Sequence, residues 1–180
     1  MSIRYAILGL LSWKPASGYE LKKVFENSPY LYWSGNNNQI YKSLLQLQND
    51  ALIVSKAIHR DGAPTKKVYS VTEKGMESLK KWLRSNAEAP DFKKPFLIQL
   101  AWSDMLGKEE LTELLTKYEK EIERQLILQK EKSDREKDWP NRTVRETFLW
   151  NMISVNLMST YQSELVWVRK VREQLQRIDE

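Results

Sequence analysis

Apolar residues recur at helical spacing through the first third of the chain, and the period then changes to that of strands. Ile7, Leu10 and Leu11 fall on one helical face, and the spacing Ser17-x-x-Glu20 is that of a capping box at the start of a second helix. A β-branched stretch follows, with an Asp-Gly turn typical of a hairpin. We therefore expect helices over 3–12, 17–27 and 37–49, strands over 52–58 and 67–71 joined by a loop over 60–66, and a helix over 72–85.

The rest of the chain has only helical periodicity, beyond a hinge at residues 86–91. An apolar helix is predicted over 95–105, with Gly107 as its C-cap, and a charged amphipathic helix over 108–134. From Arg142 to about Ile178 there is neither Gly nor Pro, and Thr143-x-x-Glu146 has capping-box spacing. This pattern predicts one long final helix.

Apolar side chains recur every three or four residues along that final helix, from Phe148 to Ile178. A long apolar stripe that extends past its own domain favours pairing with a second copy of the chain, because exposed apolar surface is costly. The alternative is that the helix packs back onto residues 108–134 within one chain. On the first hypothesis the dimer interface contains Val155, Met158, Leu165, Val168 and Leu175.

Charge is unevenly distributed along the 180 residues. Residues 1–86 contain 13 Lys and Arg against 6 Asp and Glu, a difference of +7, whereas residues 87–180 contain 16 against 18, a difference of −2. The two add to the net charge of +5. A basic first half indicates a module that binds a polyanion, although scatter in composition could produce the same excess.

Several classes of chemistry are disfavoured by composition. The chain has no cysteine and a single histidine, His59, so thiolate nucleophiles, iron–sulfur clusters and histidine-rich zinc sites are excluded. We expect no enzyme activity, no metal and no cofactor. The longest uncharged stretch, residues 147–163, contains too many polar side chains for a membrane span, and no cleavable signal is evident. A cytoplasmic protein with no membrane partner is expected.

Four linked motifs in the first half resemble the PadR family of transcriptional regulators. They are Ala6-Ile-Leu-Gly-Leu-Leu11, Ser17-Gly-Tyr-Glu-Leu21, the segment from Gln39 to Leu47, and Tyr69-Ser-Val-Thr-Glu-Lys-Gly75. The second half is similar to the longer PadR subtype with a virulence-activator C-terminal domain. Two positions depart from the family: Lys42 stands where proline is common, and Ala51 where glycine is common, which questions the usual left-handed turn there.

The element order and the resemblance together imply a mainly α fold with a small β-hairpin. We expect a winged helix-turn-helix DNA-binding domain over residues 1–86 and an antiparallel helical dimerisation domain over 87–180. The resemblance implies a homodimer on double-stranded DNA at an inverted-repeat operator, a repressor more often than an activator, and release by a small aromatic or drug-like effector.

The third predicted helix has the composition of a recognition helix. A helical wheel places Ile40, Leu44 and Leu47 inward, with Tyr41 and Leu45 on the flank. Outward amides suit adenine, and lysine suits guanine or phosphate, which favours a half-site containing A·T pairs. The expected DNA contacts on this helix are Asn38, Gln39, Tyr41, Lys42, Ser43 and Gln46.

Further DNA contacts are expected from the wing and from the starts of the first two helices. The wing offers Arg60, Lys66 and Lys67, in a loop that could equally be a solvated turn. Tyr5, Ser17 and Tyr19 are candidate phosphate contacts, and both tyrosines could instead be core aromatics.

The resemblance also implies an effector site, because the family's effector pockets are aromatic and lie near the junction of the two domains. Each of the candidate residues for such a pocket could instead simply pack in a hydrophobic core. The candidates are Phe96, Trp102, Met105, Phe148, Trp150 and Met152. Two other functions remain open: a winged-helix adaptor that binds protein and not DNA, and a small enzyme with carboxylate chemistry alone.

Overall fold

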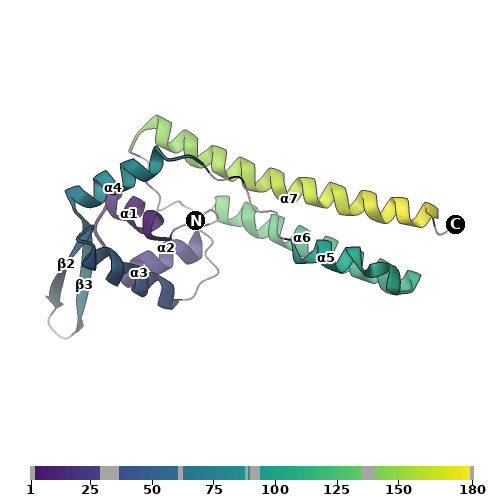
Figure 1. Ribbon diagram of the computed structural model, residues 1–180, viewed down its shortest axis with the longest axis horizontal. Coiled ribbons are helices and arrows are strands. Elements are labelled where there is room, and N and C mark those ends of the chain that lie inside the picture. Colours follow the sequence, from purple (N-terminus) through teal and green to yellow (C-terminus); the bar gives the residue numbers. More distant parts are fainter. Residues whose placement is uncertain are drawn as a thin grey trace. The chain divides into compact units, whose positions relative to one another are not determined.

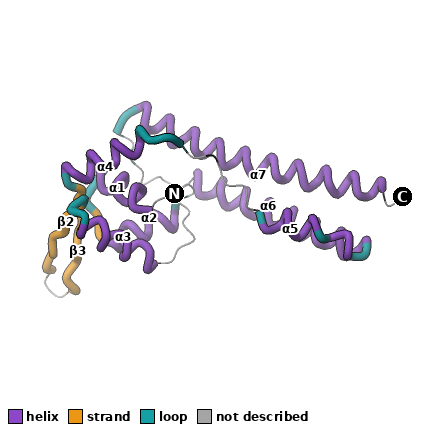
Figure 2. The backbone as a smooth tube through the Cα atoms, viewed as in Figure 1, coloured by secondary structure: helices purple, strands orange, loops and turns teal. Residues whose placement is uncertain are grey.

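The computed structural model describes residues 3–28, 37–60, 63–87, 89, 94–134, 140 and 142–178. The chain divides into two compact units, the first comprising residues 1–87 with 138–146 and the second 88–137 with 147–180. Each unit has its own hydrophobic core. Figure 1 labels the helices and strands, and Figure 2 colours them by type.

The first unit contains the helices and the hairpin that the sequence predicts, with one short strand added. That strand, β1, pairs with β3 through Ala16–Tyr69 and Ser17–Val68, and the antiparallel sheet has the order β1-β3-β2. Two residues are too few to show an alternating pattern, so β1 had no sequence signal. The elements are α1 (Ile3–Trp13), β1 (Ala16–Ser17), α2 (Gly18–Asn27), α3 (Asn37–Asn49), β2 (Ile53–Arg60), β3 (Ala63–Val71) and α4 (Glu73–Leu83).

The wing is longer than predicted. β2 and β3 pair as far as Arg60 with Ala63, and Lys66 lies opposite Ile58. The prediction that residues 60–66 form a loop is therefore wrong for Arg60 and Lys66, whose backbones lie in strands. Turn-forming residue types indicate that the chain reverses, but cross-strand pairing decides how close to the turn each strand continues.

α1 and α3 provide much of the first unit's core. Leu8 and Leu47 have no exposed surface, and Leu44 is 1% exposed. α4 packs close to the start of β2 because Gly75 has no side chain: a methyl group there would overlap the carbonyl oxygen of Leu52. The core residues are Ile7, Leu8, Leu10, Leu11, Ala16, Leu21, Phe25, Ile40, Leu44, Leu47, Leu52, Ile53, Tyr69 and Leu79.

The turn between α3 and β2 keeps the left-handed geometry that the alanine at position 51 had placed in doubt. Ala51 has φ 58°. The N–H of Leu52 bonds to the carbonyl of Leu47, and the N–H of Ala51 to that of Gln48, the two bonds of a Schellman motif. The Thr72 hydroxyl also donates to the Ala51 carbonyl at 2.9 Å. These bonds hold an alanine in a conformation that favours glycine.

The second unit is a helical hairpin with a short helix beside it. The predicted helix 95–105 is divided into α5 (Pro95–Ala101) and the 3₁₀ turn η1 (Ser103–Met105). Gly107 begins the next helix instead of capping the previous one, since its N–H bonds to the Glu110 carboxylate at 3.0 Å. The long helices are α6 (Lys108–Asp134) and α7 (Val144–Ile178), whose first turn belongs to the first unit.

α7 packs against α5 and α6 of its own chain along its C-terminal half. The second core consists of Phe96, Leu115 and Val168, with Leu165 and Leu175 partly buried against it. Val168 is fully covered within its own chain, as the intramolecular alternative predicts, so its side chain is not available to a partner. Leu165 and Leu175 are only partly buried, and their place in a dimer interface stays a prediction. Periodicity shows that one face of a helix is covered, but not which chain covers it.

Charged side chains join the helices of this second core. The Arg169 guanidinium bonds to the buried Glu119 at 2.7 Å and to Glu123 at 2.6 Å, and Arg172 reaches Glu119 at 2.6 Å. The Tyr118 hydroxyl donates to Glu164 at 2.7 Å. The pKa of Tyr118 is raised, mainly because the side chain is partly buried and secondly because its hydroxyl bonds to a carboxylate. Such paired charges fix the register of α6 against α7.

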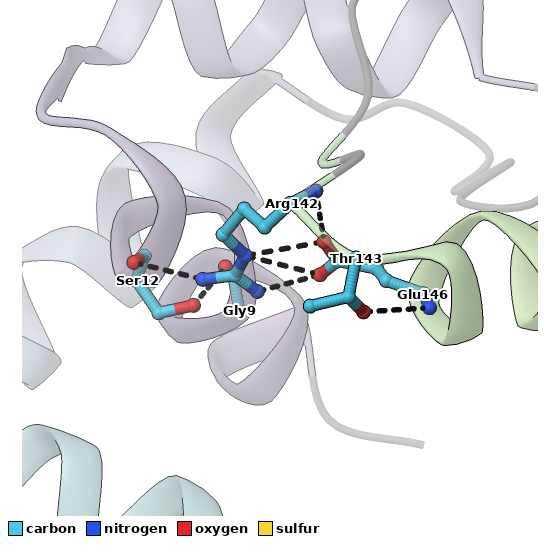
Figure 3. A network of polar contacts seen from close by, with 5 residues as sticks. All are labelled: Gly9, Ser12, Arg142, Thr143 and Glu146. Carbon is cyan, nitrogen blue, oxygen red and sulfur yellow. Dashed lines mark hydrogen bonds and ion pairs between the residues drawn. The ribbon is translucent and has the colours of Figure 1, made fainter.

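The segment before α7 binds to the end of α1 (Figure 3). Arg142 Nη1 donates to the Ser12 carbonyl at 3.2 Å, and the guanidinium also bonds to the Glu146 carboxylate at 2.6 Å. The Thr143 hydroxyl accepts the N–H of Glu146, as the capping box predicts, but the carboxylate of Glu146 accepts the N–H of Arg142. A cation thus satisfies a carbonyl at the C-terminus of α1.

None of the helices in the described segments combines the length and the apolar character that crossing a membrane requires.

The left-handed alanine gives a test of the turn. Replacing Ala51 by glycine should raise the free energy of unfolding by up to about 1 kcal/mol, because glycine adopts positive φ without steric cost. The same change at Ala57, an exposed residue within β2, should lower it by about 0.5–1 kcal/mol. Urea unfolding at one protein concentration measures both. A lower stability for Ala51→Gly would contradict the turn geometry.

Candidate nucleic-acid interface

α3 presents one polar face to solvent. Ile40, Leu44 and Leu47 are buried, which confirms their predicted inward orientation. Ser43 is only 5% exposed, so the prediction that it faces DNA is wrong. On the wheel, Ser43 lies 60° from Ile40, at the edge of the buried face. The exposed residues are Asn38, Gln39, Tyr41, Lys42, Leu45, Gln46 and Asn49.

Tyr41 is held over the first residue of α2. A methyl group on Gly18 would lie 2.6 Å from Cε1 of the Tyr41 ring and 3.3 Å from its hydroxyl. The absence of a side chain at position 18 therefore leaves the space that the ring occupies. Half of the Tyr41 surface remains exposed, so the residue can both pack on α2 and face a ligand.

Glu20 connects the start of α2 to the wing. Its carboxylate accepts the Ser17 N–H at 2.8 Å, the Ser17 hydroxyl at 2.7 Å and the Lys66 ammonium at 2.8 Å. The Glu20 N–H bonds back to the Ser17 hydroxyl, which completes the predicted capping box. These bonds lower the pKa of Glu20 to about 2; the bond from Lys66 has the largest effect and the bond from the Ser17 N–H the next largest.

This arrangement changes the roles predicted for Ser17 and Lys66. Ser17 is 5% exposed and its hydroxyl is used within the cap, so its prediction as a phosphate contact is wrong. Lys66 is already paired with a carboxylate. The spacing Ser17-x-x-Glu20 predicts the cap, but nothing in the sequence indicates that a lysine 46 residues later would join it.

Lys67 is positioned by a residue that the sequence did not single out. Gln48 accepts a bond from the Lys67 ammonium at 3.3 Å and donates one to the Ser55 hydroxyl at 3.2 Å. Gln48 thereby links α3 to both strands of the wing. The Lys67 ammonium also lies 5.4 Å from the centre of the Tyr69 ring. The side chain of Arg60 lies outside the described residues.

The two tyrosines predicted as phosphate contacts differ in their surroundings. Tyr5 stacks on Trp82 with ring centres 4.6 Å apart and packs against the core, so it is the core aromatic of the alternative interpretation. Tyr19 is exposed, and the Lys23 ammonium lies 4.9 Å from its ring centre. Tyr19 therefore stays a candidate contact at the start of α2.

The electrostatic environment of α3 favours an anion. The helix contains no acidic residue. Asp50, which follows it, is paired with Arg4, and Glu20 is paired with Lys66. Within the segments that the structure describes, no carboxylate forms an ion pair with Lys42. An exposed, uncompensated lysine thus lies among amide side chains on this face.

The residues proposed for an effector pocket fall into two groups of the second unit. Phe96 is buried, stacked on Tyr118 with ring centres 3.5 Å apart. Lys94, two residues earlier, pairs with Glu164, which is 16 residues and about 24 Å along α7 from Phe148. Trp102, Met105, Phe148 and Met152 are exposed, and Trp150 is half-buried. Phe96 and Phe148 therefore do not line one pocket within a single chain, because they lie far apart along the long helix. An effector site built from these candidates stays a prediction.

The first unit has the architecture of a winged helix-turn-helix, followed in the chain by a helical unit. The model of the transcriptional regulator PadR-like family matches residues 7–81, and that of the virulence activator alpha C-terminal family matches residues 92–176. The chain therefore contains a domain of the PadR-like family of transcriptional regulators, followed by a domain of the virulence activator alpha C-terminal family.

Two curated relatives agree with this assignment. The negative transcriptional regulator PadR of Bacillus subtilis is 29% identical over 113 residues, which is 62% of each chain. A probable transcriptional regulator of Mycobacterium tuberculosis is 32% identical over 83 residues, which is 46% of this chain and 44% of the relative. The matching segments thus span less than two thirds of these relatives.

Solved structures share the fold over almost the whole chain. Bacillus subtilis PadR in complex with operator DNA has a TM-score of 0.82 at 21% identity, covering 96% of this chain and 98% of that one. The smu.1604c protein of Streptococcus mutans has a TM-score of 0.74 at 26% identity, covering 94% and 98%. The Vibrio cholerae virulence activator AphA has a TM-score of 0.74 at 20% identity, covering 98% and 99%.

The Glu20–Lys66 pair predicts a pH dependence. The pKa of Glu20 is lowered from 4.5 to about 2 in the folded state, so the pair's contribution to stability is fully present above pH 4.5 and is lost as the pH falls through about 2. Titration of the Glu20 carboxyl carbon by NMR should show this pKa, and Lys66→Met should raise it. Lys67→Met, which removes a bond to an amide, is the control. A Glu20 titration unchanged by Lys66→Met would contradict the pairing.

Proposed function

We propose that the protein is a sequence-specific, double-stranded-DNA-binding transcriptional regulator that acts as a homodimer on an inverted-repeat operator. The observation that carries the proposal is the exposed face of α3, where amides surround Lys42 and no acidic residue occurs on the helix. Such a face suits the major groove, where amides and cations bond to base edges. The wing, with the exposed Lys67, lies against phosphates.

Comparisons support this proposal over the adaptor that binds protein alone. A structure of Bacillus subtilis PadR with the same fold contains operator DNA, and the curated Bacillus relative is a negative regulator. Repression is therefore the proposed direction of regulation. We propose no enzyme activity and a cytoplasmic location. Residues 1–86 are the proposed DNA-binding domain and residues 87–180 the proposed dimerisation domain.

The N-terminal half of α7 is the proposed dimer surface. Phe148, Met152 and Val155 are 58%, 46% and 53% exposed and follow one another at spacings of four and three residues. Met158 continues the row and is half-buried. Because this apolar row is exposed in one chain, a second copy is the occupant we propose for it. Dimers place two recognition helices on the two halves of an inverted repeat.

We also propose that a small aromatic effector releases the DNA. Bacillus subtilis PadR has been solved in complex with p-coumaric acid, and the exposed aromatic and methionine side chains near the start of α7 and after α5 offer apolar contacts. These side chains are exposed within one chain. An effector bound to them would therefore be enclosed by the second copy of the chain in the dimer. Repeating the promoter-binding assay with p-coumaric acid tests this: release supports it, and unchanged binding contradicts it for this compound.

Replacing Lys42 should weaken binding to DNA from the protein's own promoter region. The slope of log K against log salt should decrease in magnitude by about 1 for each phosphate that the variant no longer binds. Fluorescence anisotropy at several salt concentrations measures both affinity and slope for Lys42→Gln. The control is Lys170→Gln, which removes the same charge from an exposed position on the C-terminal half of α7. Equal binding by the two variants would favour the adaptor.

A glutamate in the apolar row should separate the dimer. Val155→Glu would bury an unpaired carboxylate at the interface, at a cost of several kcal/mol, so sedimentation velocity should show monomers where the unmodified chain sediments as a dimer. Gln174→Glu adds the same charge to an exposed position nearer the end of α7 and should leave the dimer intact. A Val155→Glu variant that remains dimeric would place the interface elsewhere.

A further inference from the structure

Leu45 occupies the middle of the exposed face of α3. At 100° per residue, Leu45 lies within about 40° of Asn38 and Asn49 and opposite Leu47. Its side chain is 60% exposed, although the sequence placed it on the flank. The other exposed residues within about 60° of Leu45 all carry a polar group: Asn38, Tyr41, Lys42 and Asn49. Leu45 is thus an apolar side chain at the point that would enter a groove most deeply.

Tyr41, one turn earlier on the same face, has a structural role that accounts for its presence there. Its ring packs over Gly18, so its position is set by contacts within the protein. Leu45 is more exposed than Tyr41, and the buried side of the helix is already occupied by Ile40, Leu44 and Leu47. The folded unit therefore gains little from a leucine at position 45.

The major groove presents one apolar group, the 5-methyl of thymine, and apolar side chains recognise it. We infer that Leu45 is a specificity-determining residue that contacts a thymine methyl group in each half-site. This inference rests on the proposed function and deepens it. The surrounding charge favours DNA over a protein partner, because Lys42 is uncompensated among the described residues and α3 lacks acidic side chains.

The test replaces thymines of the bound promoter fragment one at a time by deoxyuridine, which removes the methyl group and keeps every base-pair hydrogen bond. For the unmodified protein, one position in each half-site should weaken binding about fourfold, the effect of one buried methyl group. Leu45→Ala should bind the thymine DNA more weakly, and deoxyuridine at that position should then cause no further loss. Leu45→Met, which keeps an apolar contact, should retain the sensitivity.

A matched variant and a folding control make the result specific. Gln46→Ala, the adjacent exposed position, should keep the response to deoxyuridine while changing affinity. Thermal unfolding should show equal stability for Leu45→Ala, since the side chain is largely exposed. Bound DNA that is insensitive to deoxyuridine, or a sensitivity that survives Leu45→Ala, overturns the inference and leaves the proposed function standing. Failure of the unmodified protein to bind its promoter DNA overturns the proposed function itself.

Discussion

The rotation of α3 about its own axis is the constraint on which the rest of the first unit depends. Leu44 and Leu47 are buried almost completely in a core shared with Ile7 and Leu8 of α1. Turning the helix by one residue would expose two leucines and bury amides, at a cost of several kcal/mol. Apolar burial therefore decides which side chains face outwards, even though the buried residues touch no ligand.

The fold was largely predictable because most of its elements carry local signals. Capping residues, helical periods and the Asp-Gly turn are contained within a few positions each, and they located α1 to α4 and the two long helices. Ala51 shows where such local reasoning fails: its residue type argues against a left-handed turn, but bonds from Leu52 and Thr72 hold it there. Distant partners outweighed the preference of one residue.

The candidate site was predictable only in part, because its chemistry depends on contacts between distant segments. The wheel placed Lys42 outward but misplaced Ser43, since the width of the buried face depends on neighbours that the helix sequence does not name. Ser17 and Lys66 were both expected to be available, and both are bound to Glu20. Likewise, the stripe on α7 is continuous in sequence, but α6 covers Val168 and leaves Val155 exposed. Periodicity cannot separate these two halves.

The Arg142 bond to the end of α1 means that the first unit is assembled from two stretches of chain. Residues 138–146, more than fifty positions beyond Ala87, supply the cation that satisfies the Ser12 carbonyl. A truncated protein that ends after α4 would therefore lack residues 138–146, which belong to the first unit. Residues 1–86 transferred alone to another protein would leave the Ser12 carbonyl without its Arg142 partner. A winged helix of this chain is therefore complete only when a later stretch of the same chain returns to it.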